Sequence, residues 1–308
     1  MIYNNSFIRF FNRLSISIPP ATPFLENITA VSNFGFGVRE GETSDFGITL
    51  GNNSESFNVG FVNGSLNNFL GSSFYDELSS QGEVFVESIY DQTTQTSFNL
   101  DPVNPPVIVF DQASFPYFDL SGDNFISGFN TTLTNDFTII FNQQSIGNLT
   151  LFSNTDSSVV LSVVDDRLNL IAPGFDVTST APLFDRQSFS DIFIIRTGND
   201  LTFFNSGFSL GTFNFTLSSF DINLLGNSTG SFFLTEFFTF DTALSTTDLN
   251  AYQDNSLSSD SADLNFEEQS FGILLPSYPQ LNFEEQDSDI LFPVYPTLTF
   301  TEQDINAL

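Results

Sequence analysis

Acidic side chains are the only abundant ionisable groups in this sequence that could carry catalytic or metal-binding chemistry. The chain of 308 residues has 37 Asp and Glu, and it contains no His, no Cys and no Lys. Without Cys there are no disulfides or thiolate metal sites, and without His the commonest general base and zinc ligand are missing. The absence of Lys removes Schiff-base chemistry and the P-loop lysine. Hydrolysis by paired carboxylates is the main enzymatic route that remains.

The charge balance excludes two classes of partner. The net charge is −31, and the only basic residues are Arg9, Arg13, Arg39, Arg167, Arg186 and Arg196. A chain this acidic repels nucleic acid and anionic membrane surfaces, so we expect neither as a partner. No stretch reaches the roughly 18 apolar residues of a membrane span, so we expect no membrane insertion either.

The N-terminal arm, residues 1–28, is the only locally basic stretch. Arg9 and Arg13 lie inside its apolar run, where they interrupt the hydrophobic region of a secretory signal. Either the mature chain begins elsewhere, or the protein reaches the outside without the secretory pathway, as virion proteins released by lysis do. The arm itself is interpreted either as a docking segment or as a short strand followed by a linker.

Residues 29–255 are predicted to form two β-rich parts. Runs such as FGITL and GEVFVESIY, separated by Gly, Asn and Ser, predict a small β-rich module over 29–105. Over 106–255, runs such as DFTIIFNQ, DIFIIRTGN and SFFLTEFFTFD are rich in Phe and β-branched residues and are bounded by turn residues. This pattern predicts a two-sheet sandwich. Ser245, followed three residues later by Asp248, predicts the capped start of a short helix.

The tail, residues 256–308, contains an internal repeat with a period of 17 residues. LNFEEQSFGILLPSYPQ is followed by LNFEEQDSDILFPVYPT, and a third copy then begins. A unit this short cannot fold alone. The copies therefore either dock as equivalent strands that drive assembly or form an acidic, partly disordered tail. The predicted assembly residues, which recur at equivalent positions, are Phe266, Phe283, Phe300, Tyr278 and Tyr295.

The sandwich segment resembles the laminin-G-like jelly roll of the concanavalin A-like lectins and glucanases. SFPYFDLSGDNF is similar to the opening of that family, SDIFIIRTGNDLTFFNSGFSLGT to its central hairpin, and SFFLTEFFTFDTALSTTDLNAY to its closing strand and helix. In the hairpin, Asn205, Ser206 and Gly207 would form the turn. The usual Trp of the first core strand is absent, and Phe141 or Ile140 would fill its space. The resemblance implies an all-β sandwich that binds glycans or proteins through loops at one edge, as in phage virion appendage proteins.

The resemblance also implies a calcium ion at the rim of the sandwich, held by the oxygen ligands that hard cations prefer. Asp and Asn are equally common as ordinary turn residues, so ligation and turn formation both remain open. The candidate ligands are Asp119, Asp123, Asn124, Asp165 and Asp166, with Asn154 and Asp156 as a further option.

The enzymes of this superfamily have a recognisable strand pattern of catalytic carboxylates. Glucanases of this superfamily carry two Glu and one Asp in the spacing Glu-x-Asp-x-x-Glu, so that all three face the cleft. No such run occurs here, and the nearest strand, LTEFFTFD, has a single central glutamate, Glu236. We therefore expect no catalytic residues.

Three hypotheses follow for the function. The first is a non-enzymatic virion or extracellular surface protein, in which the jelly roll recognises a surface glycan and the tail joins it to other structural subunits as a homo-oligomer. The second is a filament or extracellular matrix subunit without ligand binding. The third is a polysaccharide-degrading enzyme that uses Glu236.

Overall fold

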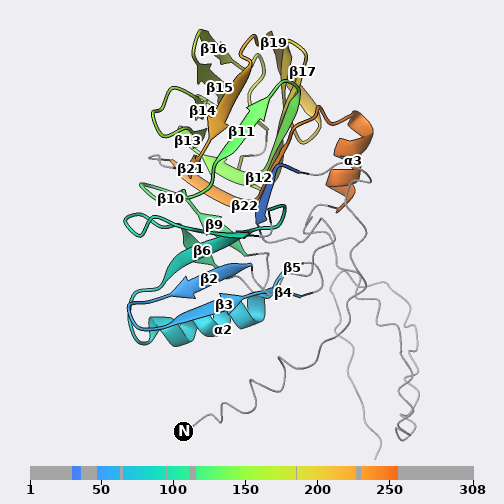
Figure 1. Cartoon of the computed structure of the whole chain (residues 1–308). Helices are drawn as coiled ribbons and strands as arrows, with labels where there is room; N and C mark the ends of the chain where they lie inside the picture. Colours follow the sequence, from blue (N-terminus) through green and yellow to red (C-terminus); the bar gives the residue numbers. More distant parts are fainter. Residues whose placement is uncertain are drawn as a thin grey trace, which may run out of the picture. The chain divides into compact units, whose positions relative to one another are not determined.

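The computed structural model describes residues 30–35, 47–62, 65–94, 96–110, 116–184, 186–226 and 230–255. These residues form antiparallel sheets and two short helices, which confirms the all-β jelly-roll prediction (Figure 1). No helix within these ranges is long and apolar enough to cross a membrane. The arm 1–28 and the repeat tail, with its predicted assembly residues, lie outside the described residues.

Two antiparallel sheets make up the sandwich. The larger sheet is ordered β19 (Phe208–Asn214), β18 (Asp200–Asn205), β17 (Ser190–Thr197), β12 (Phe137–Ile146), β22 (Ser231–Phe240), β9 (Tyr117–Asp119) and β8 (Val107–Val109), with β1 (Ser32–Gly35) also on β22. The smaller sheet is ordered β10 (Phe125–Ile126), β21 (Leu224–Gly226), β13 (Leu149–Ser153), β14 (Val160–Val164), β15 (Arg167–Ala172) and β16 (Phe175–Thr178). A separate ladder joins β11 (Thr131–Thr134) to β20 (Ser219–Ile222).

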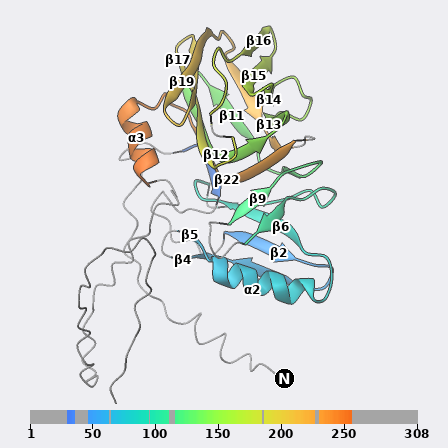
Figure 2. The ribbon, with the colours of Figure 1, turned by 180° about the vertical axis from the view of Figure 1, so that it is seen from behind.

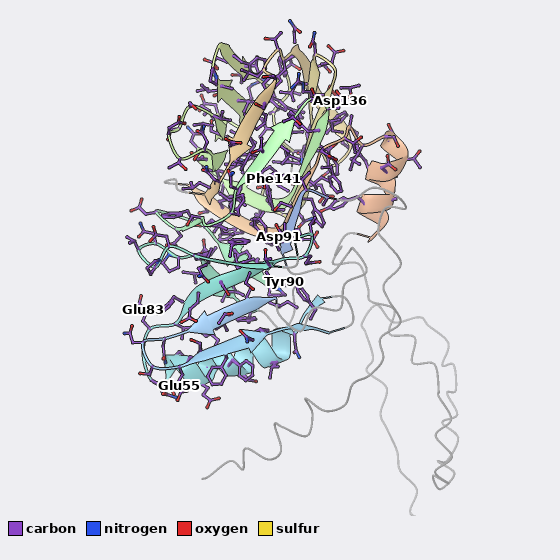
Figure 3. The ribbon with its side chains drawn as sticks, in the orientation of Figure 1. Glu55, Glu83, Tyr90, Asp91, Asp136 and Phe141 are labelled. Atoms are coloured by element: carbon purple, nitrogen blue, oxygen red, sulfur yellow. The ribbon has the colours of Figure 1, made fainter. Side chains whose placement is uncertain are left out.

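Alternation along β12 sorts its side chains onto the two faces of the larger sheet. Ile139 and Phe141 enter the core between the sheets, whereas Ile140 belongs to a second apolar cluster on the outer face. The Phe141 ring lies 6.1 Å from that of Phe152 and 5.2 Å from that of Phe237, measured between centroids. Phe141, within the sandwich in Figure 3, is therefore the residue that occupies the inner core position.

One extra residue interrupts the ladder between β12 and β22. The register changes from Asn142 opposite Glu236 to Gln143 opposite Leu234, which leaves Thr235 in a bulge. The Thr235 hydroxyl donates to the Asn142 backbone oxygen at 3.0 Å. On its other edge, β22 pairs with β9 before the bulge and with β1 after it.

The helix α3 (Thr246–Asn255) covers part of the outer face of the larger sheet (Figure 2). The Ser245 N–H donates to Asp248 Oδ2 at 2.8 Å, and the Asp248 N–H donates to Ser245 Oγ at 3.3 Å, which confirms the predicted cap. The Tyr252 ring packs edge-on against Phe193 and Phe238, at 5.8 and 5.7 Å. The helix thus seals an apolar surface that the strands alone would leave open.

The small module is a four-stranded sheet with one helix. Its strands are ordered β3 (Ser56–Val59), β2 (Ile48–Gly51), β6 (Phe85–Asp91) and β7 (Thr96–Asn99), and β4 (Phe61–Val62) pairs with β5 (Ser65–Leu66). The helix α2 (Asn68–Ser79) lies along this sheet (Figure 1). It begins at Asn67, whose Oδ1 accepts from the Leu70 N–H at 2.9 Å. This helix was not predicted from the sequence, which indicated only strands over 29–105.

The strand β1 links the small module to the sandwich. The Phe34 ring lies 5.2 Å from Phe98 of β7 and 5.1 Å from Phe237 of β22. On the same strand, Ser32 Oγ donates to Asp91 Oδ2 at 2.6 Å. One apolar core therefore runs through segments on both sides of the predicted boundary at residue 105.

We expect Phe141→Ala to lower the free energy of unfolding by about 3–5 kcal/mol, because it opens a cavity at a completely buried ring. Phe208→Ala is the matched control, since the Phe208 side chain is 65% exposed, and it should change stability by less than about 0.5 kcal/mol. Denaturant unfolding measures both. Similar losses for the two variants would contradict the assignment of the core.

Candidate functional site

The first group of predicted calcium ligands forms a local turn between β9 and β10. Asp119 Oδ1 accepts from the Ser121 N–H at 2.9 Å, and Gly122 follows with φ +68°. Asp123 is exposed and Asn124 is half-buried. The Asp119 side chain therefore shapes the chain reversal, as such side chains commonly do.

The second group, Asp165 and Asp166, forms the tight turn between β14 and β15. Both residues have positive φ, +49° and +62°, as the central positions of a type I′ hairpin turn require. The Asp165 N–H donates to Asn148 Oδ1 at 2.9 Å, and the Asp166 carboxylate forms an ion pair with Arg186. Asp166 therefore has a protein cation as its partner.

The third option lies in the loop between β13 and β14. Asn154 Oδ1 accepts from the Val159 N–H at 2.9 Å, and Asp156 Oδ1 accepts from the Ser158 N–H at 3.0 Å. Hydrogen bonds from the side chain and backbone of Ser158 hold the pKa of Asp156 below its ordinary value. Across the described ranges, no three Asp, Glu, His or Cys side chains gather into a group that could hold a metal. Calcium binding stays a prediction.

Glu236, the candidate glutamate, is a buried structural carboxylate. Its side chain is 1% exposed, and the Tyr252 hydroxyl donates to its Oε2 at 3.2 Å. Asn142 pairs with Glu236 on one side and with Asp191 on the other, and its Nδ2 donates to Asp191 Oδ1 at 2.9 Å. Asp191 is also buried. A polysaccharide chain could not reach either carboxylate in this arrangement.

A loop that joins the two sheets carries two exposed phenylalanine rings, Phe184 and Phe189. We call residues 179–184 and 186–189, between β16 and β17, the aromatic loop. Its backbone is held at several points: the Thr180 N–H donates to Leu210 O at 2.8 Å and the Leu183 N–H to Asp166 O at 2.7 Å. The Phe184 N–H donates to Asn205 Oδ1 at 2.7 Å, and Asn205 is itself 1% exposed. The loop is therefore fixed to both neighbouring hairpins.

Arg186 is the main side-chain anchor of this loop. Its Nε donates to Ser145 O at 3.0 Å, and its two terminal nitrogens bond to Gly147 O and to the carboxylate of Asp166. The Arg186 side chain is only 13% exposed, whereas that of Asp166 is 66% exposed. One guanidinium thus ties the aromatic loop to the end of β12 and to the hairpin between β14 and β15.

Two rings project from this framework into solvent. Phe184 is 43% exposed and Phe208 is 65% exposed. Their centroids lie 5.5 Å apart at an interplanar angle of 83°, an edge-to-face contact. Phe208 begins β19 directly after the turn at Ser206 and Gly207, where φ is +47° and +83°. The predicted hairpin turn is therefore confirmed, and it presents the second ring of this Phe184–Phe208 pair.

A second aromatic group lies on the outer face of the larger sheet. Tyr117 contacts Phe189 of the aromatic loop at 5.6 Å and Phe233 of β22 at 5.4 Å, measured between centroids. We call these three residues the outer-face cluster. Val107 and Ile146 are also exposed on the strands β8 and β12. This part of the larger sheet keeps an apolar surface.

Neither aromatic group was predicted from the sequence. The sequence of residues 179–189, STAPLFDRQSF, has no strand alternation, and only carboxylates and amides were predicted as ligands in such turn-rich segments. The available signal was the presence of Phe in a segment that is too polar and irregular to be a strand. Phe at such a position has no alternating pattern that would bury it.

No family model matches the chain, and no curated protein matches its sequence. Among solved structures, the binding domain of Paraclostridial Mosquitocidal Protein 1 is 18% identical over 54% of this chain and 49% of that chain, with a TM-score of 0.41. The botulinum neurotoxin serotype D ligand-binding domain, in complex with N-acetylneuraminic acid, is 11% identical over 54% and 48%, with a TM-score of 0.43. This chain spans about half the length of those structures. A likeness at this level establishes neither ligand nor function.

We expect Tyr252→Phe to lower the free energy of unfolding by about 1.5–3 kcal/mol, because it removes a donor from the buried Glu236 carboxylate. Tyr75→Phe on the half-buried face of α2 is the matched control for losing a phenol hydroxyl. Thermal or denaturant unfolding gives both values. A neutral result for Tyr252→Phe would mean that Glu236 does not depend on this bond.

We expect Ser158→Ala to raise the pKa of Asp156 towards its ordinary value, because the Ser158 side chain is the largest cause of its lowering. A carboxylate with a lowered folded pKa stabilises the loop above its unfolded pKa and loses that effect as the pH falls through the folded pKa. Titration of the Asp156 carboxyl by NMR measures the shift. Thr155→Ala, one residue before Asp156, should leave it unchanged.

Proposed function

We propose that this protein is a non-catalytic recognition protein of a virion or other extracellular surface, and that it binds a glycan through the Phe184–Phe208 pair. The observation that carries the proposal is the exposure of two rings in contact: Phe184, on a loop that buried groups immobilise, and Phe208, at the start of β19. Aromatic rings suit this role because they offer a large, flat contact area with few rotatable bonds. The apolar faces of sugar rings can stack on such a surface.

The anchoring of the aromatic loop supports this role energetically. Binding costs free energy when loops and side chains must first become ordered. Here Asn205 and Arg186 already fix the backbone on both sides of Phe184. The loop is already ordered in the folded protein, so a ligand would bind without the free-energy cost of ordering it. The edge position is also the one that the laminin-G-like resemblance implies for ligand-binding loops.

The burial of the acidic residues on the larger sheet supports a non-catalytic role. Glycoside hydrolysis needs two carboxyl groups that flank the scissile bond in a site open to the sugar. Glu236 and Asp191 are 1% and 7% exposed and bond to neighbouring side chains. Under this proposal, purified protein should release no reducing sugar from the glycan that it binds.

A second candidate function is structural assembly, as a filament or decoration subunit. The observation that favours it is the outer-face cluster, together with exposed Val107 on β8 and exposed Ile146 on β12 of the same sheet. Contiguous apolar surface on a soluble protein commonly marks a contact with another chain. Recognition by the aromatic loop and assembly through other surfaces are compatible in a homo-oligomeric appendage protein.

We expect the double variant Phe184→Ala, Phe208→Ala to bind its glycan at least about tenfold more weakly, since it removes both exposed rings. A glycan array identifies the ligand, and calorimetry then measures the loss. Val103→Ala is the control, because Val103 is 75% exposed and lies outside the loop. Unchanged binding by a folded double variant would contradict the proposed site.

A further inference from the structure

We infer that the glycan bound by the Phe184–Phe208 pair is an uncharged oligosaccharide, and that sialylated, sulfated or uronate glycans are rejected. This inference rests on the proposed function and adds the chemical class of the ligand. It rests on two observations. The guanidinium groups of the described arginines are hydrogen-bonded to protein acceptors, and the chain contains no Lys or His.

The only cation on the aromatic loop is already engaged. Each of the three guanidinium nitrogens of Arg186 has a protein acceptor, and the acceptors are Ser145 O, Gly147 O and the Asp166 carboxylate. Its side chain is 13% exposed. Because the side chain is so little exposed, a ligand carboxylate has poor access to the two N–H groups that these three bonds leave over.

The two other arginines within the described ranges are also committed to the fold. The guanidinium of Arg167 donates to Ser179 O at 2.8 Å and to Thr180 O, at the start of the aromatic loop. Arg196 is 6% exposed, and it donates to Gly198 O at 2.8 Å and stacks over the Phe215 ring at 5.1 Å. Because the chain contains no Lys and no His, the described residues include no other cationic side chain that could pair with an anion.

The groups that remain beside the rings suit neutral sugars. The Asp166 carboxylate is 66% exposed, and Ser206 and Ser209 are exposed next to Phe208. Carboxylate and hydroxyl oxygens accept hydrogen bonds from sugar hydroxyls. Arg186 and Asp166 form an ion pair, so these two side chains together add no net charge to the aromatic loop and the adjoining hairpin. A cationic sugar would therefore find no unpaired carboxylate in that pair.

The field of the whole chain acts against anionic ligands. A net charge of −31 repels an approaching carboxylate or sulfate, and this repulsion is screened only beyond a distance of about 10 Å at about 0.1 M salt. A neutral oligosaccharide is unaffected by this field. The ionic-strength dependence of binding therefore distinguishes the two ligand classes.

The test compares three oligosaccharides of equal length by calorimetry: a neutral hexose oligomer, a uronate oligomer and a glucosamine oligomer. At about 50 mM NaCl the neutral oligomer should bind at least about tenfold more tightly than the uronate. Between about 50 and about 500 mM NaCl its affinity should change less than about twofold, whereas the weak uronate binding should increase. The inference is overturned if the uronate binds best, or if a preference for glucosamine persists at high salt.

A charge-addition variant tests the physical reason. Gln187→Lys places a free cation on the aromatic loop, where Gln187 is exposed. It should raise the uronate affinity by about threefold to tenfold and leave the neutral affinity within about twofold. Gln81→Lys adds the same charge at an exposed position just after α2 and should have a much smaller effect. Equal effects of the two variants would show that only the net charge matters and would overturn the local argument.

The outcomes also separate this inference from the function on which it rests. If no oligosaccharide binds, or if Phe184→Ala, Phe208→Ala leaves binding unchanged, the proposed function fails. If binding depends on the two rings but favours the uronate, the proposed function stands and the assignment of a neutral ligand fails.

Discussion

The bulge at Thr235 is the constraint on which the arrangement of the sandwich depends. Side chains alternate between the faces of a strand, so one added residue changes which face every later side chain meets. Before the bulge Leu234 faces the inner core, and after it Phe237 does so while Glu236 and Phe238 face outward. Without the extra residue, the apolar residues on one half of β22 would lie on the wrong face.

The same bulge separates the two strands that pair with this edge of β22. The strand pairs with β9 through Phe233 and Leu234, and with β1 from Glu236 onwards. β1 ends there at Gly35, where an added Cβ would lie 2.5 Å from the Thr235 carbonyl oxygen. Only glycine fits this close approach. The attachment of the small module to the sandwich through β1 therefore depends on a local irregularity in one central strand.

Features set by short-range patterns were predictable from the sequence, and features set by distant partners were not. Phe and β-branched runs predicted the sandwich strands, the Asn205–Ser206–Gly207 turn followed from turn chemistry, and Ser245 with Asp248 indicated α3. In α2, by contrast, Gly71 and three serines weaken the helical signal, and Gly71 leaves room for the Phe110 ring, which would lie 2.2 Å from an added Cβ. Likewise, the four residues of β1 pair with a strand about 200 positions later. The exposure of Phe184 depends in the same way on tertiary contacts of Asn205 and Arg186.

The position of the two exposed rings depends on the packing of both sheets. Phe184 is held through Asn205 at the end of β18 in the larger sheet, while Arg186 reaches the hairpin of β14 and β15 in the smaller sheet. The same guanidinium bonds to Ser145 O on β12, which lies next to β22. A change in the spacing of the sheets would therefore alter the geometry of the pair without touching either ring. The arginines Arg167, Arg186 and Arg196 donate hydrogen bonds to backbone oxygens and so hold these loops in place. The recognition surface is therefore rigid, and it has no free guanidinium group for an anionic ligand.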